Sequence, residues 1–528
     1  MNRALLVVAS IVVVGIAAAG VGQRVRSRAA AALLPSLPDL AGQPTAVAEH
    51  LHDADAQARR DPASAHAVGA LGMAYHADLF YDAAAEAYQA AKRLAPDDVE
   101  WNYLLALIHV ERGEAAEAAA RLREIVAANP GMALAWLRLG DAEFKRAHYQ
   151  EADEAYSRAE DAPRAANAGV PAVDAASPAR SETIPVAAHA ALGQARIALQ
   201  QGDIERARQS LEKVVDETPR FGAAHRLLGD AYERLGDRDK AARHIARAAA
   251  LPAFSAAPDP RVDALARESR RSVLLIKQAA ASDLVRDAAW REYLLRRALE
   301  FDGANPDVVY EMGALLQQLK RPRDALPYFE RHLDMVSDDQ QTLVQIGKCQ
   351  ADLGQFKEAE SVLRRAVALA NDAVGEYNLG YVLEQVGRAD EAERQYQRAL
   401  ALNPGLASAH TNLGTALVAR GRFTEAAAHL TEAVRLEPGN AAARNNLGAL
   451  LLQQRQLDAA AGQFRLALEL NPDHADAHAN LGSALAQQGA YDDALRQFDE
   501  ALRIEPRHSA AGANRQAVLA RLQAQDRR

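Results

Sequence analysis

A regular repeat of about 34 residues in the C-terminal half of this 528-residue chain constrains its fold more than any other feature. Each copy contains a Leu-Gly pair, then an alanine, a large apolar residue, a second alanine and a closing proline. The four Leu-Gly pairs are Leu379-Gly380, Leu413-Gly414, Leu447-Gly448 and Leu481-Gly482, and the closing prolines are Pro404, Pro438, Pro472 and Pro506. A fixed period of this length indicates stacked copies of one supersecondary unit.

The composition favours helices as the content of each unit. Hydrophobic residues make up 49% of the chain but aromatic residues only 5%, so alanine, leucine and valine supply most of the apolar side chains. Alanine and leucine are strong helix formers, and β-branched or aromatic runs are too few for large sheets. We therefore expect two antiparallel helices per unit.

The fixed spacing assigns a physical task to each position of the unit. Glycine in the first helix and the first alanine of the second helix let the two helices approach closely. The large residue, such as Phe464, is expected to fill the space between neighbouring units, and proline ends the second helix because it cannot continue the hydrogen-bond ladder. One unit cannot bury its apolar faces alone, so stacking must supply the core.

This pattern resembles that of tetratricopeptide repeat (TPR) proteins, which have Leu-Gly in the first helix and alanine, a large apolar residue, alanine and proline in the second. The resemblance implies an all-α, right-handed α-solenoid. Eleven units can be recognised. They occupy residues 65–166 (repeats 1–3), 188–255 (repeats 4–5) and 306–508 (repeats 6–11).

The remaining segments have different expected roles. Residues 24–64 form a tether and lead-in helix, and 509–528 form a capping helix and tail that cover the last apolar face. Residues 167–187 contain Pro171, Pro178 and Pro185 and are expected to be an excursion without regular structure. Residues 256–305 are expected to be a degenerate repeat with a lengthened first helix, or a joint between two arrays.

Residues 1–23 contain an uncharged apolar run that extends from Ala4 to Gly22. As a helix this run is about 28 Å long, close to the roughly 30 Å hydrocarbon core of a membrane. A cleaved signal peptide and a buried core helix are alternatives, but the length favours an uncleaved membrane anchor. The arginines at 24, 26 and 28 favour a cytoplasmic repeat domain by the positive-inside rule. Such helices on bacterial repeat proteins commonly deliver the domain outside the cytoplasm, and we expect this extracytoplasmic, periplasmic placement.

No motif in the sequence points to catalysis, a metal or a cofactor. There is no Gly-rich phosphate loop, nucleophile elbow or His-Glu-x-x-His motif. His474 and His478 are four positions apart, but the first lies in an inter-repeat turn, and we expect solvated histidines there, as at His50 and His52. Cys349 is the only cysteine, and the 61 basic against 70 acidic residues give a net charge of -9, which disfavours nucleic-acid binding. We therefore expect no enzyme activity, cofactor or metal.

One polar pattern stands out, because an asparagine lies two positions before each of the four glycines. These residues are Asn378, Asn412, Asn446 and Asn480. The first helices of such repeats face the concave surface, so equal spacing would stack the amides into a ladder. Because an amide side chain both donates and accepts hydrogen bonds, the ladder is expected to hold the backbone of an extended peptide. It is similar to the asparagine ladder in the repeat domain of O-linked N-acetylglucosamine transferases. The alternative is that asparagine only suits the fold at this position.

The function expected from this resemblance is a scaffold that binds protein or peptide partners in its concave groove and assists assembly of a membrane or envelope complex. An accessory subunit of an envelope enzyme or polysaccharide-export system, or a cytoplasm-facing adaptor, is the alternative. Weaker candidates for the groove are neighbours of the asparagines and three aromatic residues near the N-terminus. They are Thr411, His410, Asn445, His478, Trp101, Tyr103 and Trp136. The oligomeric state is left open.

Overall fold

The computed structural model describes residues 27–162, 184–249, 251, 257, 259–280 and 288–526. Within these ranges the regular structure is entirely helical, as expected for the predicted all-α solenoid. The apolar run Ala4 to Gly22 and nearly all of the predicted excursion 167–187 lie outside them. None of the helices in the described ranges has the length and apolar character needed to cross a membrane.

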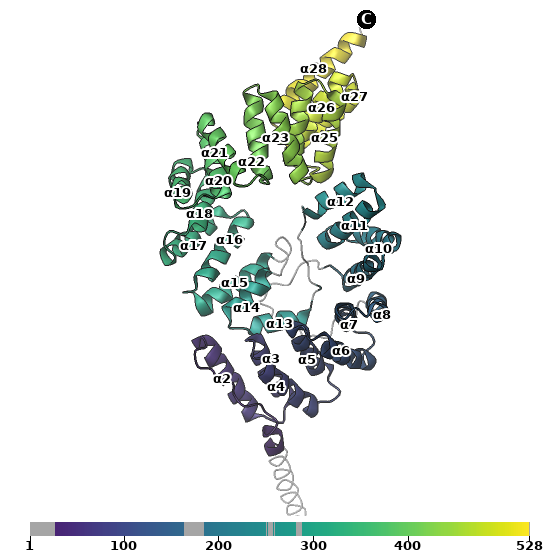
Figure 1. Ribbon diagram of the computed structural model, residues 1–528, viewed down its shortest axis with the longest axis vertical. Coiled ribbons are helices and arrows are strands. Elements are labelled where there is room, and N and C mark those ends of the chain that lie inside the picture. The colour runs from purple at the N-terminus through teal and green to yellow at the C-terminus, as the bar shows by residue number, and fades with distance from the viewer. Residues whose placement is uncertain are drawn as a thin grey trace, which may run out of the picture. The chain divides into compact units, whose positions relative to one another are not determined.

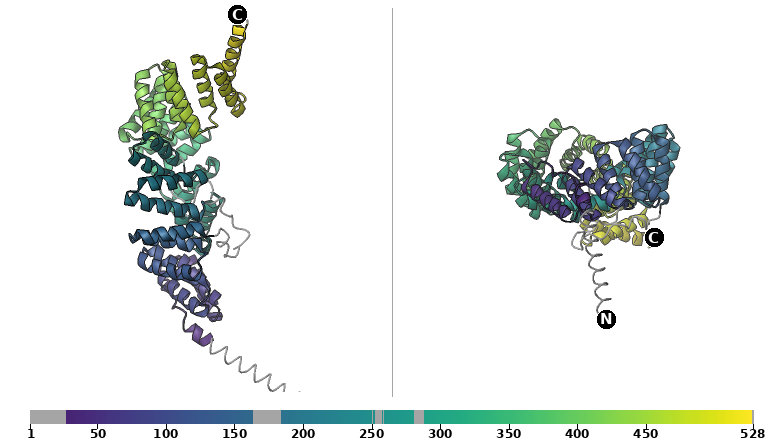
Figure 2. Two further views of the ribbon diagram at one scale, coloured as in Figure 1. Left: turned by 90° about the vertical axis from the view of Figure 1, so that its right-hand side faces the viewer. Right: turned by 90° about the horizontal axis from the view of Figure 1, so that it is seen from below.

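The helices follow one another in pairs joined by short turns (Figures 1 and 2). From the lead-in helix to the predicted joint, the helices are α2 (Thr45–Arg60), α3 (Ala65–Ala77), α4 (Tyr81–Leu94), α5 (Val99–Arg112), α6 (Ala115–Ala128), α7 (Ala133–Lys145), α8 (Tyr149–Asp161), α9 (Val186–Gln201), α10 (Ile204–Glu217), α11 (Gly222–Leu235), α12 (Arg238–Ala249), α13 (Pro260–Glu268), α14 (Ser272–Ala280) and α15 (Ala288–Asp302).

The C-terminal repeats continue the same alternation. Their helices are α16 (Pro306–Gln318), α17 (Pro322–Met335), α18 (Gln340–Asp352), α19 (Phe356–Leu369), α20 (Ala373–Gln385), α21 (Ala389–Leu402), α22 (Ala407–Ala419), α23 (Phe423–Leu436), α24 (Ala441–Gln453), α25 (Leu457–Leu470), α26 (Ala475–Gln488), α27 (Tyr491–Ile504) and α28 (Ser509–Asp526). The first helix of each repeat is called its A helix below and the second its B helix.

The described chain divides into two compact units. The first contains Met1–Leu227 and Phe254–Leu315, and the second contains Leu228–Ala253 and Leu316–Arg528. The predicted joint 256–305 therefore belongs to the first unit. It differs from the expected repeat with one lengthened first helix, because it contains the separate helices α13, α14 and α15, of which α14 and α15 pack together as a pair.

Close helix contact depends on the repeated glycine, as the spacing predicted. A Cβ atom at Gly448 of α24 would lie 2.6 Å from Cε1 of Phe464 in α25, and Phe464 is fully buried. The large residue therefore packs on the glycine of its own repeat. It also reaches the next repeat in at least one place, because a Cβ at Gly193 of α9 would lie 2.4 Å from the ring of Tyr156 in α8. The predicted position between neighbouring units is thus only part of its role.

The turns within the repeats require backbone in the left-handed region. Gly387, Gly421 and Gly489 have φ values of 79°, 73° and 84° between the A and B helices of their repeats. Arg455 takes the same place in the repeat of α24 and α25, with φ at 60°. A side chain makes this conformation costly, so the one repeat with arginine carries strain that its neighbours avoid.

Candidate functional site

The A helices of the second unit place the predicted asparagines one repeat apart. Asn412, Asn446 and Asn480 lie on α22, α24 and α26 and are partly exposed. Asn378 on α20 is only 9% exposed, and its amide donates to the carbonyl oxygen of Val374 in the same helix at 2.8 Å. Asn378 is therefore the least accessible of the four predicted residues.

Each of the three exposed asparagines donates an amide hydrogen to the A helix of the preceding repeat. Asn412 Nδ2 lies 3.3 Å from Tyr377 Oη and Asn480 Nδ2 lies 3.0 Å from Asn445 Oδ1. Asn446 Nδ2 lies 3.0 Å from Thr415 Oγ1. The asparagines therefore link consecutive repeats, a structural role that the sequence alone left as the alternative. Asn412 also donates to Tyr396 Oη at 3.4 Å, and Asn446 Oδ1 accepts from Asn445 Nδ2 at 3.5 Å. Asn446 and Asn480 still have a second N–H, and each of the three carbonyl oxygens has a lone pair to offer.

A fifth member of this series was not predicted from the sequence. Asn514 follows Asn480 by one full period, on the capping helix α28, and is exposed. Its Nδ2 donates to Ser483 Oγ at 3.0 Å, again in the A helix of the preceding repeat. The period itself was the signal that would have identified it, but α28 was treated only as a cap.

The neighbouring polar residues hold the turns between repeats. His410 Nε2 and His478 Nε2 lie 3.1 and 3.0 Å from the carbonyl oxygens of Pro404 and Pro472 in the preceding turns. A carbonyl can only accept, so each Nε2 must carry the hydrogen. Thr411 is buried and donates to its own helix.

The aromatic residues predicted as anchors fall into three different environments. Trp101 is 4% exposed and stacks on Tyr88 with ring centroids 6.3 Å apart, so it belongs to the core. Trp136 Nε1 donates to the carbonyl oxygen of Pro130 at 2.9 Å, which is the same turn contact that the histidines make. Tyr103 on α5 is fully buried and donates from Oη to Asp259 Oδ2 at 2.7 Å. The hydrogen bond of Tyr103 thus reaches a segment from outside the repeats.

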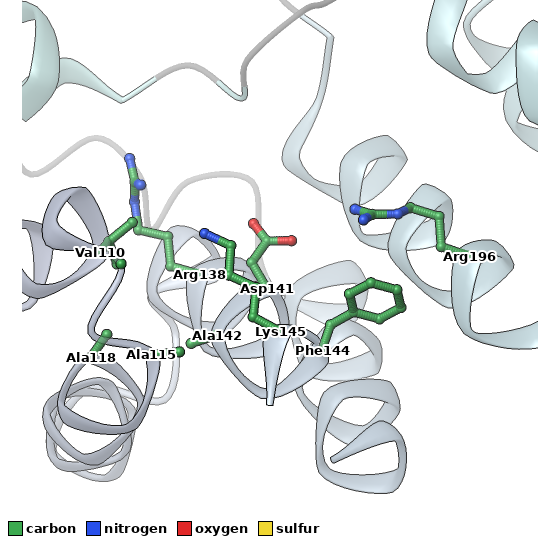
Figure 3. Close-up of a pocket in the computed structure, with 10 residues that line it drawn as sticks. Val110, Ala115, Ala118, Arg138, Asp141, Ala142, Phe144, Lys145 and Arg196 are labelled. Atoms are coloured by element: carbon green, nitrogen blue, oxygen red, sulfur yellow. The ribbon is translucent and has the colours of Figure 1, made fainter. Parts of the chain in front are cut away.

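A cavity of about 330 Å³ lies beside α7, at the lower end of the range for ligand pockets. Figure 3 shows Asp141 and Lys145 on α7 beside each other, with Phe144 directed toward Arg196 of α9, whose guanidinium carbon lies 4.5 Å from the centre of the Phe144 ring. Burial raises the pKa of the Asp141 carboxyl, although the hydrogen bond from Tyr156 Oη and nearby cationic side chains oppose this shift. The side chains that line this cavity carry charges of both signs, negative on Asp141 and positive on Lys145 and Arg196.

Metal ligation finds no support in the part of the chain that the structure describes, where no three histidine, cysteine, aspartate or glutamate side chains form a group suited to a metal ion. His50 is not the solvated histidine that the sequence led us to expect. Its Nδ1 lies 3.1 Å from Asp78 Oδ2 and its Nε2 lies 3.3 Å from Glu268 Oε2. Burial lowers the pKa of His50, but the hydrogen bonds to Asp78 and Glu268 together outweigh burial and raise the pKa above its ordinary value.

A family model described as "Tetratricopeptide repeat" matches seven segments, several of which overlap, that together cover more than half of the chain. They are residues 103–169, 163–220, 192–258, 310–374, 377–441, 411–472 and 445–509. The chain belongs to the tetratricopeptide repeat family. The TPR resemblance of the sequence and the predicted all-α solenoid are thereby confirmed, and the TPR repeats suggest a protein–protein interaction scaffold.

Individual relatives and solved structures differ widely in how much of this chain they match. It is 29% identical over 130 residues to Tetratricopeptide repeat protein 16 of Homo sapiens, and the match covers 22% of this chain and 15% of that protein. Among solved structures, the Cut9–Hcn1 hetero-tetramer of the APC/C is 16% identical with a TM-score of 0.38, covering 84% of this chain and 93% of that chain. YrrB, titled a TPR protein with an unusual peptide-binding site, is 22% identical with a TM-score of 0.24, covering 42% and 97%.

Proposed function

We propose that this TPR protein is a non-enzymatic scaffold that binds extended peptide segments of partner proteins on the A helices of its second unit. The observation that carries the proposal is the series of partly exposed side-chain amides on α22, α24 and α26, one in each repeat. A peptide backbone presents alternating donors and acceptors, and amides spaced one repeat apart can pair with it independently of its sequence.

The hydrogen bonds within the series define which amides are available. The A helix of the preceding repeat takes one amide hydrogen from each of Asn412, Asn446 and Asn480. Asn412 also donates to Tyr396 Oη, so the groups proposed to meet the peptide are the second amide hydrogens of Asn446 and Asn480 and the carbonyl oxygens of all three side chains. The amide of Asn378 is directed to its own helix and its side chain is buried, so we assign it a structural role.

The test compares the triple alanine variant at Asn412, Asn446 and Asn480 with Asn378→Ala as the matched control. Partner peptides are first captured by crosslinking in intact cells and then titrated calorimetrically. Each exposed amide contributes about 0.5–1.5 kcal/mol of net hydrogen-bond energy, so the triple variant should bind roughly tenfold to a thousandfold more weakly. The control should bind normally. Unchanged affinity in a folded triple variant would limit the asparagines to their structural role.

We further propose that Ala4 to Gly22 anchors the protein in a membrane, with the repeats outside the cytoplasm, where they assist assembly of an envelope complex. The support is the length and apolar character of the run, which contains no charged residue. A C-terminal reporter that is active only after export tests this topology. An active reporter is the expected result, whereas a silent reporter on a stable fusion would favour the cytoplasm-facing adaptor, in agreement with Arg24, Arg26 and Arg28.

A further inference from the structure

Residues 259–271, called the docked segment below, leave the succession of helix pairs and lie on the A helices of the first repeats. The segment contains α13, and α13 packs against α3 of repeat 1 (Figure 1). Its contacts also reach α5 of repeat 2 and α7 of repeat 3. All of these residues belong to the first unit. The segment therefore occupies, in repeats 1–3, the face that in the second unit carries the asparagines.

A buried carboxylate holds the beginning of the docked segment. Asp259 is 2% exposed, and its Oδ2 accepts hydrogen bonds from Tyr103 Oη at 2.7 Å and Arg138 Nη2 at 2.6 Å. Its Oδ1 accepts from the backbone N–H of Arg261 and so caps α13. Burial alone would raise the pKa of this carboxyl, but the charge of Arg138 and the hydrogen bonds from Tyr103 and Arg138 hold the pKa below its ordinary value.

An ion pair and an apolar contact follow Asp259 along the docked segment. Arg261 Nε lies 2.7 Å from Glu100 Oε2, and the Arg261 guanidinium carbon lies 4.9 Å from the centre of the Tyr103 ring. Leu265 is 5% exposed and joins the core formed by the first repeats. Val262 packs against the same core and Ala266 is buried, so three neighbouring residues supply the apolar contact of the segment.

A second buried carboxylate, now supplied by the repeats, holds the end of the docked segment. Asp78 is fully buried, and its Oδ1 accepts from Ser269 Oγ at 3.2 Å and from the backbone N–H of Arg270 at 2.9 Å. Arg271 donates to the backbone carbonyl of Asp78 at 3.1 Å and to Gln43 Oε1 at 2.8 Å. Both ends of the segment are thus recognised by specific polar groups.

The relative weight of polar and apolar contacts determines how strongly the docked segment is held on repeats 1–3. A nine-residue helix such as α13 is too short to be stable by itself, so its conformation depends on the face that it covers. That face recognises it through charged groups at both ends and through the apolar residues Val262, Leu265 and Ala266. Intramolecular interfaces of this polar kind resemble those of transient complexes more than those of domain cores.

We propose that the docked segment is an internal ligand of repeats 1–3, and that a partner helix with the same features exchanges with it. Such a partner would carry aspartate at the N-cap, arginine two positions later and leucine six positions after the aspartate, as Asp259, Arg261 and Leu265 do here. The proposal goes beyond the function proposed for the asparagines and does not depend on it, because the triple asparagine variant should leave this exchange unchanged.

The test uses a fluorescent peptide with the sequence of residues 257–273 and the full-length protein. In the wild type the docked segment competes at the effective concentration of a tethered ligand, about millimolar, and should suppress binding of the added peptide. Asp259→Asn removes one charge from a buried pair and weakens the internal competitor. The peptide should therefore bind this variant about tenfold or more tightly than it binds the wild type, as measured by fluorescence anisotropy.

Two controls make the outcome decisive. Asp339→Asn alters another N-cap aspartate, which accepts from the backbone of Thr342 at 2.7 Å in the second unit, and should not change peptide binding. A peptide with asparagine in place of Asp259 should bind the Asp259→Asn variant weakly. Equal peptide binding to the folded wild type and folded Asp259→Asn variant would overturn the proposal.

Where Asp259→Asn fails to fold, Arg261→Ala replaces it, because the Arg261 side chain is 14% exposed, more than that of Asp259, and its ion pair with Glu100 also holds the segment. A gain in peptide affinity in this variant supports exchange. Loss of folding in both variants would identify the docked segment as a permanent part of the first unit and would also overturn the proposal.

Discussion

Substituting Gly448 by alanine tests whether the repeated glycine exists to admit the large residue of its own repeat. The added Cβ atom would lie 2.6 Å from Phe464 Cε1 and 2.9 Å from Cδ1, whereas ordinary contacts begin near 3.4 Å. Phe464 is fully buried and has no solvent side to which its ring can move. Overpacking of this kind costs about 1–3 kcal/mol.

Alanine also has a higher helix propensity than glycine, by about 1 kcal/mol, and this gain must be separated from the clash. Gly462 provides the matched control, because it lies inside α25 of the same repeat and a Cβ there meets nothing within 4 Å. Gly462→Ala should stabilise the repeat by roughly 0.5–1 kcal/mol. The difference in stability between the two variants then isolates the clash, expected at about 1–3 kcal/mol.

Hydrogen exchange of the α24 and α25 amides is the appropriate measurement, because a solenoid unfolds repeat by repeat and a single global transition would average the effect. A double-mutant cycle with Phe464→Ala should give a coupling free energy of about 0.5–3 kcal/mol, since removing the ring relieves the clash. If Gly448→Ala protects the repeat as much as Gly462→Ala does, the proposed reason for the glycine is incorrect.

Three further predictions follow from strained, buried or titrating groups. Arg455→Gly should stabilise its repeat by about 0.5–1 kcal/mol, because φ is 60° at Arg455 and glycine adopts this conformation without strain. The expected result is a higher Tm, and an unchanged or lower Tm would contradict the prediction. Burial raises the pKa of the Cys349 thiol to about 12, so thiol reagents at pH 8 should modify it only in urea, and rapid native labelling would refute its placement. The raised pKa of His50 means that its contribution to docking is complete below its ordinary value of 6.5 and is lost as pH rises through the raised value. Amides of α13 should therefore exchange faster at pH 8 than at pH 6, after correction for the intrinsic pH dependence of exchange, and His50→Gln should abolish this difference.

The pH dependence expected for His50 is set by its burial, which lowers its pKa, and by the charged groups Asp78, Glu268 and Arg270. Asp78 and Glu268 accept from its ring and favour the protonated form, whereas the positive charge of Arg270 opposes it. The hydrogen bond from His50 lowers the pKa of Glu268, so the carboxylate side of the contact is lost only in more acidic solution, as pH falls below the ordinary value of 4.5. Docking should therefore be strongest between these two limits.

Much of the fold could be predicted because each repeat position has a local physical task. The glycine of the A helix, the large residue and the proline recur at fixed spacing, and packing within and between adjacent repeats follows from that spacing. The left-handed turn at Arg455 could also have been predicted, since glycine stands at the corresponding positions 387, 421 and 489. Periodicity is informative wherever contacts recur with the period.

The docked segment could not be predicted by the same reasoning. Asp259 meets Tyr103 across 156 positions and Arg270 meets Asp78 across 192, and neither separation is related to the repeat. The sequence offered only weak local signals, namely an aspartate before Pro260 as a helix start and a cluster of arginines at its end. A contact that occurs only once in the chain produces no periodic pattern in the sequence.

The hydrogen bonds of the asparagines set a limit on what they can contribute to partner binding. Asn446 already donates to Thr415, and Asn480 to Asn445. A peptide that took these amide hydrogens would exchange one hydrogen bond for another and gain little free energy. A peptide that uses the second amide hydrogen and the carbonyl oxygen would add bonds and keep neighbouring repeats linked. Binding of the second kind should increase hydrogen-exchange protection of α24 and α26, whereas binding of the first kind should reduce it, so the sign of that change identifies the amide groups that the partner engages.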